Sequence, residues 1–152
     1  MGYVSSNLLP EESVVYSGKV HWFVLIPGFL FLIIGFLVAP IEDETGWMFF
    51  IGLLLILYGI GRIIDAIVKI YTTELAVTSK RIIAKLGLIR RETIELNHNK
   101  VESFKVDQSI LGRVFGFGTL TINGTGGIQT PIRTVTKPLE FRRKAMEITD
   151  QE

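Results

Sequence analysis

Cysteine is absent from the 152-residue chain, and histidine occurs only twice. Without cysteine there is no disulfide framework, no thiolate nucleophile and no cysteine metal site. His21 and His98 lack the spacing of zinc ligands, and we expect both to face solvent or an interface. Residues 116–118 lack the third glycine of a dinucleotide fingerprint, and no P-loop lysine follows any glycine cluster. We therefore expect a non-enzymatic protein with no catalytic residue, cofactor or metal.

Charged residues are missing from two long apolar runs, residues 22–39 and 47–61. At 1.5 Å of rise per helical residue the first run reaches about 27 Å, close to the ~30 Å of a bilayer's hydrocarbon core. The second run continues through Arg62, whose long side chain can reach the interface from near the end of the helix. We predict a transmembrane α-helical hairpin. The alternative is a buried pair of helices in a soluble domain, but a chain this short has too few other residues to cover both runs.

Basic residues are missing from the turn between the two runs, which carries Glu42, Asp43 and Glu44. From residue 69 onward the chain has fourteen bases against nine acids. Lys and Arg near a membrane mark its cytoplasmic side. We therefore predict a multi-pass protein of the cell (inner) membrane with both termini cytoplasmic and the acidic turn outside.

The hydrophobic period changes from helical to two after the second run, which indicates β-strands. We expect three parts: an N-terminal cytoplasmic segment at residues 1–19, the hairpin at 20–69, and a soluble β-rich domain at 70–152. Because residues 70–152 contain every predicted strand, we expect them to fold alone. The predicted strands are residues 71–78, 81–86, 88–96, 101–107, 119–122 and 128–135.

Two helices are predicted among these strands. Ser109 is a suitable N-cap for a short helix over residues 110–115, which the following glycines end. Pro138 can open an amphipathic helix that continues through Ile148. Pro131 interrupts the last strand and should lie at an edge or a bulge, because proline cannot donate to a ladder.

Several stretches resemble the bacterial pleckstrin-homology domain family of membrane-flanking type. The resemblance is carried by His21-Trp22, by residues 78–83 and 87–89, and most specifically by residues 108–113 followed by 116–122. It implies a small bent antiparallel β-sandwich or partly open barrel with a C-terminal helix, next to a membrane hairpin. It brings no catalytic residues, and it implies a membrane-attached scaffold.

Two functions fit this pattern. The first is a membrane-anchored scaffold or interaction module that associates with itself or with other membrane proteins. The second is a sensor of anionic lipid, since each base near such a surface contributes on the order of 1 kcal/mol. These same bases could instead be solvated strand residues and topology signals. The possible lipid-facing residues are Lys69, Lys80, Arg81, Lys85, Arg90 and Arg91.

Glycines recur seven residues apart in both apolar runs, which places them near one helical face. Gly28, Gly35, Gly52 and Gly59 could form a packing seam, either between copies or within the hairpin, unless they reflect only the ordinary frequency of glycine in membrane helices. We expect a homo-oligomer or a complex with other membrane proteins. A small oligomeric channel or transporter is less favoured, because neither run carries an ionisable residue at its centre. Nucleic acid and a small-molecule substrate are not indicated.

Overall fold

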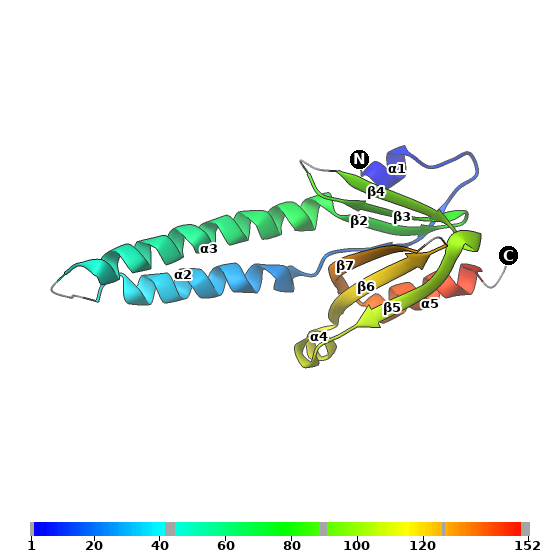
Figure 1. Cartoon of the computed structure of the whole chain (residues 1–152). Helices are drawn as coiled ribbons and strands as arrows, with labels where there is room; N and C mark the ends of the chain where they lie inside the picture. Colours follow the sequence, from blue (N-terminus) through cyan, green and yellow to red (C-terminus); the bar gives the residue numbers. More distant parts are fainter. Residues whose placement is uncertain (1, 42–44, 89–90, 126, 150–152) are drawn as a thin grey trace. The chain divides into compact units, whose positions relative to one another are not determined.

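The computed structural model describes residues 2–41, 45–88, 91–125 and 127–149 (Figure 1). The chain divides into two compact units, Met1–His21 with Tyr71–Glu152, and Trp22–Ile70. We call them the β-domain and the helical hairpin, and each is described by itself.

Two antiparallel sheets form the body of the β-domain. Among the described residues, one sheet has the strand order β1-β2-β3-β4 and the other has the order β5-β6-β7. Helix α5 (Pro138–Thr149) follows the last strand, and α1 (Tyr3–Ser6) precedes the first. The strands are β1 (Val14–Gly18), β2 (Glu74–Thr78), β3 (Arg81–Leu86), β4 (Glu92–Asn97), β5 (Val101–Asp107), β6 (Phe117–Gly124) and β7 (Ile128–Thr136).

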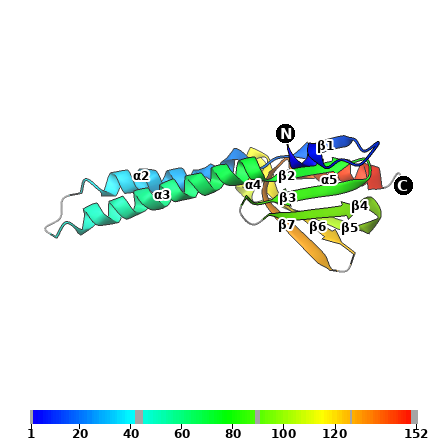
Figure 2. The same cartoon turned by 90° about the horizontal axis from the view of Figure 1, so that it is seen from above.

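Both sheets and α5 contribute to a single apolar core. Figures 1 and 2 show where these elements lie in the β-domain. Ile82 of the first sheet, Ile122 of the second and Phe141 of α5 are all completely or almost completely buried in it. The outer face of the first sheet is covered as well. There Val4 of α1 packs against Ala76 and Ile83. The N-terminal residues therefore act as a third layer over this sheet.

The hairpin consists of the 3-10 turn η1 (Trp22–Leu25) and the helices α2 (Ile26–Val38) and α3 (Trp47–Thr72). Its buried residues are small: Gly28 and Gly35 in α2, and Gly52, Gly59 and Ala66 in α3. A Cβ built on Gly52 would lie 2.5 Å from the Ala39 Cα, and one on Gly59 would lie 2.9 Å from the Leu32 nitrogen. The helices can approach this closely only because the facing residues are glycines.

Among the described helices, α3 alone is long and apolar enough to cross a membrane, by length and composition only. The segment Trp22–Val38 is apolar but shorter. Toward the end of α3, Asp65 lies 3.7 Å from Arg62 and 2.7 Å from Lys69, so the charges of this last part are paired along the helix. The acidic turn, with Glu42, Asp43 and Glu44, lies outside the described residues.

Much of the predicted β-domain is confirmed. The chain forms two antiparallel sheets with helices, including α4 (Ile110–Phe115) with Ser109 as its N-cap and α5 beginning at Pro138. Pro131 lies on β7, which ends the three-stranded sheet, as its missing N–H requires.

The expectation that residues 70–152 contain every strand is wrong. Strand β1 comes from the segment placed outside the β-domain, and it pairs antiparallel with β2 from Val14↔Thr78 to Gly18↔Leu75. Its side chains are mostly exposed, because β1 is an edge strand. Five residues with one buried position carry too little alternation to be recognised as a strand.

Several boundaries also differ from the prediction, two of them by three residues or more. Helix α3 continues to Thr72, so β2 begins at Glu74 and not at residue 71. Strand β4 begins at Glu92 and not at residue 88. In the first case the helical run simply continues beyond its apolar part, where ion pairs on one face support it.

Residues 2–21 should therefore be required for a stable β-domain. We expect residues 2–21 joined by a flexible Gly/Ser linker to residues 71–149 to melt cooperatively as a β-rich protein. Residues 70–152 alone should be unfolded or melt at a clearly lower temperature, because β2 loses its edge partner and its covering layer. Circular dichroism during heating measures both. Equal melting temperatures would show that β1 contributes nothing.

Candidate functional site

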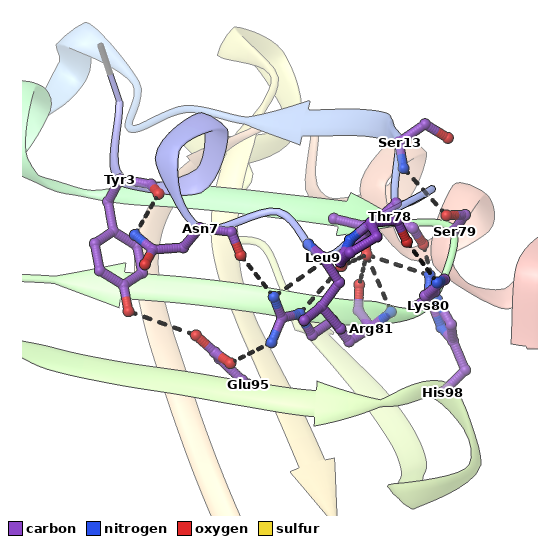
Figure 3. A network of polar contacts seen from close by, with 12 residues as sticks. Tyr3, Asn7, Leu9, Ser13, Thr78, Ser79, Lys80, Arg81, Glu95 and His98 are labelled. Carbon is purple, nitrogen blue, oxygen red and sulfur yellow. Dashed lines mark hydrogen bonds and ion pairs between the residues drawn. The ribbon is translucent and has the colours of Figure 1, made fainter.

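A polar cluster ties the N-terminal segment to the first sheet, and we call it the N-terminal clasp (Figure 3). At its centre the guanidinium of Arg81 reaches both carboxylate oxygens of Glu12, with Nε–Oε1 and Nη2–Oε2 distances of 3.1 Å. It also donates to Glu95 at 2.6 Å and to the Asn7 carbonyl at 2.8 Å. The Glu12 side chain is fully buried. One base thus joins β3, β4 and the segment before β1.

Glu12 is held as a carboxylate. Burial raises its pKa and is the largest single effect, but hydrogen bonds from the Leu9 N–H, the Thr78 hydroxyl and Arg81, with the charge of Arg81, outweigh it. The pKa of Glu12 therefore lies below its ordinary value. The Thr78 hydroxyl lies 2.6 Å from Glu12 Oε1, to which it donates, and it accepts the Arg81 N–H at 3.0 Å.

A second carboxylate secures the beginning of the chain. Glu74 of β2 accepts the backbone N–H groups of Tyr3 at 2.8 Å and Val4 at 3.0 Å, and its other neighbour is Lys85 at 3.5 Å. Burial raises the pKa of Glu74, but these hydrogen bonds and the lysine charge lower it by more. The segment from Tyr3 to Glu12 is therefore fixed to the sheet at both ends.

His98 belongs to the interior, which corrects the expectation that it faces solvent. It is completely buried, and its Nε2 lies 2.9 Å from the Thr78 carbonyl, an acceptor that requires the proton on Nε2. Its Nδ1 has no hydrogen-bond partner within the described ranges. His21 packs against Phe117, with ring centroids 5.4 Å apart.

The members of the proposed basic cluster that lie in β3 and the turn before it make separate contacts. Arg81 is only 12% exposed in the clasp, and Lys85 lies beside Glu74 with its ammonium 5.2 Å from the Tyr3 ring. Lys80 donates to the Pro10 carbonyl. It lies just before β3, whereas Lys85 lies near the end of that strand, so the rise of a strand separates the two lysines by roughly 15 Å.

The structure describes two of the three remaining members of the set. Lys69 pairs with Asp65 in the hairpin, and Arg91 is exposed before β4. Arg90 lies outside the described residues. These bases are close in sequence, but a lipid site requires their side chains on the same face of the domain.

The four glycines of the predicted seam face each other within one chain. A Cβ on Gly28 would meet Ile63 of α3 at 2.5 Å, and one on Gly35 would meet Ile56 at 2.7 Å. With Gly52 and Gly59 they line the contact between α2 and α3. This seam is filled by the hairpin itself.

A groove of about 420 Å³ lies between β5 and α5. Residues 101–104 form one wall, and Arg142, Met146 and Thr149 form the other. Strand β5 ends its sheet, so within the described part of the chain β6 is its only paired neighbour. An edge strand beside such a groove can accept an extended segment of another chain. Sequence reasoning did not find this groove, because it depends on how α5 docks.

Comparison with known proteins identifies the class. A family model described as bacterial PH domain matches residues 23–148, which include the hairpin helices and β2 to β7. The chain therefore belongs to the bacterial PH domain family. PH domains are generally non-catalytic interaction modules. Neither the curated proteins nor the solved structures gave a match.

Truncating Glu12 should weaken the β-domain strongly. Glu12→Ala leaves the nearly buried Arg81 without its main counter-charge, and we expect a loss of about 3 kcal/mol in unfolding free energy. Glu92→Ala on exposed β4 is the matched control and should cost under about 0.5 kcal/mol. Urea unfolding of the full chain in nanodiscs, followed by the β-sheet circular dichroism signal, measures the difference. Similar losses for both variants would contradict a stabilising clasp.

The same contact has a pH signature. A carboxyl whose pKa is depressed on folding adds stability above its unfolded pKa, 4.5 for Glu, and loses it as pH falls through the folded value. Wild type should therefore lose stability more steeply below about pH 4.5 than Glu12→Gln does. If the unfolding free energies of wild type and Glu12→Gln changed with pH in parallel, the pKa of Glu12 would not differ between the folded and unfolded states.

Proposed function

We propose that this protein is a non-enzymatic membrane anchor that displays its PH-like domain on the cytoplasmic side as an interaction module. The hairpin holds the protein in the bilayer, and the β-domain binds a segment of another membrane protein or of a second copy.

The outer surface of the hairpin carries this proposal. Phe36, Leu37 and Leu54 are 65 to 67% exposed, whereas the buried positions are small residues. A water-soluble helix pair has the opposite arrangement, with large apolar side chains inside and polar ones outside. The arrangement in this hairpin suits a surrounding of lipid tails. In lipid, helices are held together by close packing at small residues such as glycine and not by hydrophobic burial.

The polar end of α3 supports the orientation. Arg62, Asp65 and Lys69 follow the apolar run on the side that leads directly into β2, while the sequence of the turn at residues 42–44 is acidic. With bases next to the β-domain, the positive-inside rule favours a cytoplasmic β-domain.

The predicted topology can be tested with single cysteines, because the native chain has none. In intact spheroplasts a membrane-impermeant thiol reagent should label Asp43→Cys, and it should label Thr125→Cys in the β-domain only after permeabilisation. The cysteine-free parent gives the background. Labelling of both positions from one side before permeabilisation would exclude a membrane-spanning hairpin, and the reverse pattern would invert the orientation.

We place the interaction site in the groove between β5 and α5. It combines an edge strand, whose outer backbone groups can pair with an added strand, and Met146, whose flexible side chain adapts to different neighbours. The anionic-lipid alternative has less support, since Arg81 and Lys85 are committed to carboxylates.

A photo-crosslinking residue in the groove should capture the partner in membranes. We expect benzoylphenylalanine in place of Glu102, an exposed residue of the groove, to give discrete adducts of higher mass. The same residue in place of Glu92, on β4, is the control and should give few. Equal adducts at both positions, or adducts at Glu92 alone, would place the partner elsewhere.

A further inference from the structure

Helix α4 exposes large apolar side chains on its outer face. Ile110 is 79% exposed, Val114 72% and Leu111 55%, and these three residues lie within about 100° of one another around the helix. Gly112, on the opposite side, is buried against the start of β6, where an added Cβ would lie 2.6 Å from the Phe117 carbonyl oxygen. The helix therefore turns its smallest residue inward and its apolar residues outward.

This short helix is held firmly at both ends. The Ser109 side chain accepts the Gly112 N–H at 3.1 Å, and Gly116 closes the helix in the left-handed conformation with φ of 76°. Gln108 donates to the Phe117 carbonyl at 3.0 Å. The exposed apolar face thus belongs to a well-capped turn, and the caps fix the direction in which it points.

Within the β-domain, α4 lies beside the point where the chain leaves for the hairpin. The His21 N–H donates to the Thr134 carbonyl at 2.7 Å, and the His21 ring packs against Phe117, just after α4. The Lys137 N–H donates to the Gly116 carbonyl at 2.8 Å. Trp22, the first residue of the hairpin, follows His21 directly, and consecutive Cα atoms are about 3.8 Å apart. Chain connectivity alone therefore keeps α4 near the start of the hairpin.

Basic residues accompany this junction. Arg113 is exposed on α4 itself, and Lys19 is exposed on the exit segment, where its carbonyl accepts the Thr136 N–H. Lys137 follows β7, with its ammonium 3.4 Å from the Glu140 carboxylate. Apolar side chains beside Lys and Arg are the combination that suits the boundary between lipid headgroups and acyl chains.

We propose that α4 inserts Ile110, Leu111 and Val114 into the headgroup–acyl boundary of the bilayer, next to the point where the chain enters it. This inference rests on the proposed membrane insertion of the hairpin. It gives the β-domain a second attachment, which restricts its rotation about the hairpin and sets which of its surfaces face the cytoplasm.

The experiment uses the full chain in vesicles of equal parts phosphatidylcholine and phosphatidylglycerol. Single-cysteine variants Val114→Cys, Leu54→Cys and Thr125→Cys carry an environment-sensitive dye, and the vesicles contain lipids brominated near the headgroup or near the methyl end. Leu54 reports the hairpin, and Thr125, exposed beyond the far end of β6, is the aqueous control. Ile110→Cys is a second, independent probe of α4.

We expect the dye at Val114 and Ile110 to be blue-shifted and quenched roughly twofold by bromines near the headgroup, as shallow burial requires. The Leu54 dye should be quenched by deep bromines, and the Thr125 dye by neither. If Leu54 is quenched while both α4 positions resemble Thr125, or are blue-shifted without bromine quenching, α4 faces water or protein and the inference is overturned. If Leu54 is not quenched, the proposed membrane insertion itself fails, and the inference fails with it.

Discussion

The pairing of β1 with β2 is the constraint on which the rest of the architecture depends. These strands are neighbours in the sheet, yet the entire hairpin lies between them in the chain. Their antiparallel register brings Gly18, where β1 ends, beside Leu75, where β2 begins. The hairpin must therefore leave and return at the same end of the β-domain. A pair of antiparallel helices meets this requirement.

The clasp reinforces this arrangement at the other end of the same strands. Glu12 precedes β1, and its carboxylate is buried against Thr78 and Arg81 at the β2–β3 turn. Burying a charge is tolerable only when it is paired and hydrogen-bonded, and Glu12 accepts from three separate donors. The N-terminal segment thus closes over the first sheet as a covering layer, with Val4 completing the burial of Ala76 and Ile83.

Regular patterns made most of the fold predictable. The apolar runs, the alternation that follows them, Ser109 as a cap and Pro138 at a helix start each have a local cause that is visible in the sequence. Strand β1 has no such cause, since its five residues are an exposed edge and gain their structure from β2. Its recognition would have required Glu12 to be seen as a buried partner of Arg81, a contact between residues far apart in sequence.

The same reason explains why the contacts of the basic residues were not predicted. Counting charges along the chain treats each base as solvated, but Arg81 and Lys85 point to carboxylates that the folded N-terminal segment, β2 and β4 supply. The groove between β5 and α5 likewise depends on the docking of two distant elements. Contacts set by chain connectivity can be inferred from sequence, whereas contacts set by packing cannot.

The interrupted β-domain also has a consequence for biosynthesis. A ribosome releases β1 first, then the apolar hairpin, and only afterwards the strands that β1 needs. The N-terminal segment must therefore wait, unpaired, until β2 has emerged. During that interval β1 lacks its partner strand, and an unpaired strand of this kind is what cellular quality control recognises in unfinished chains.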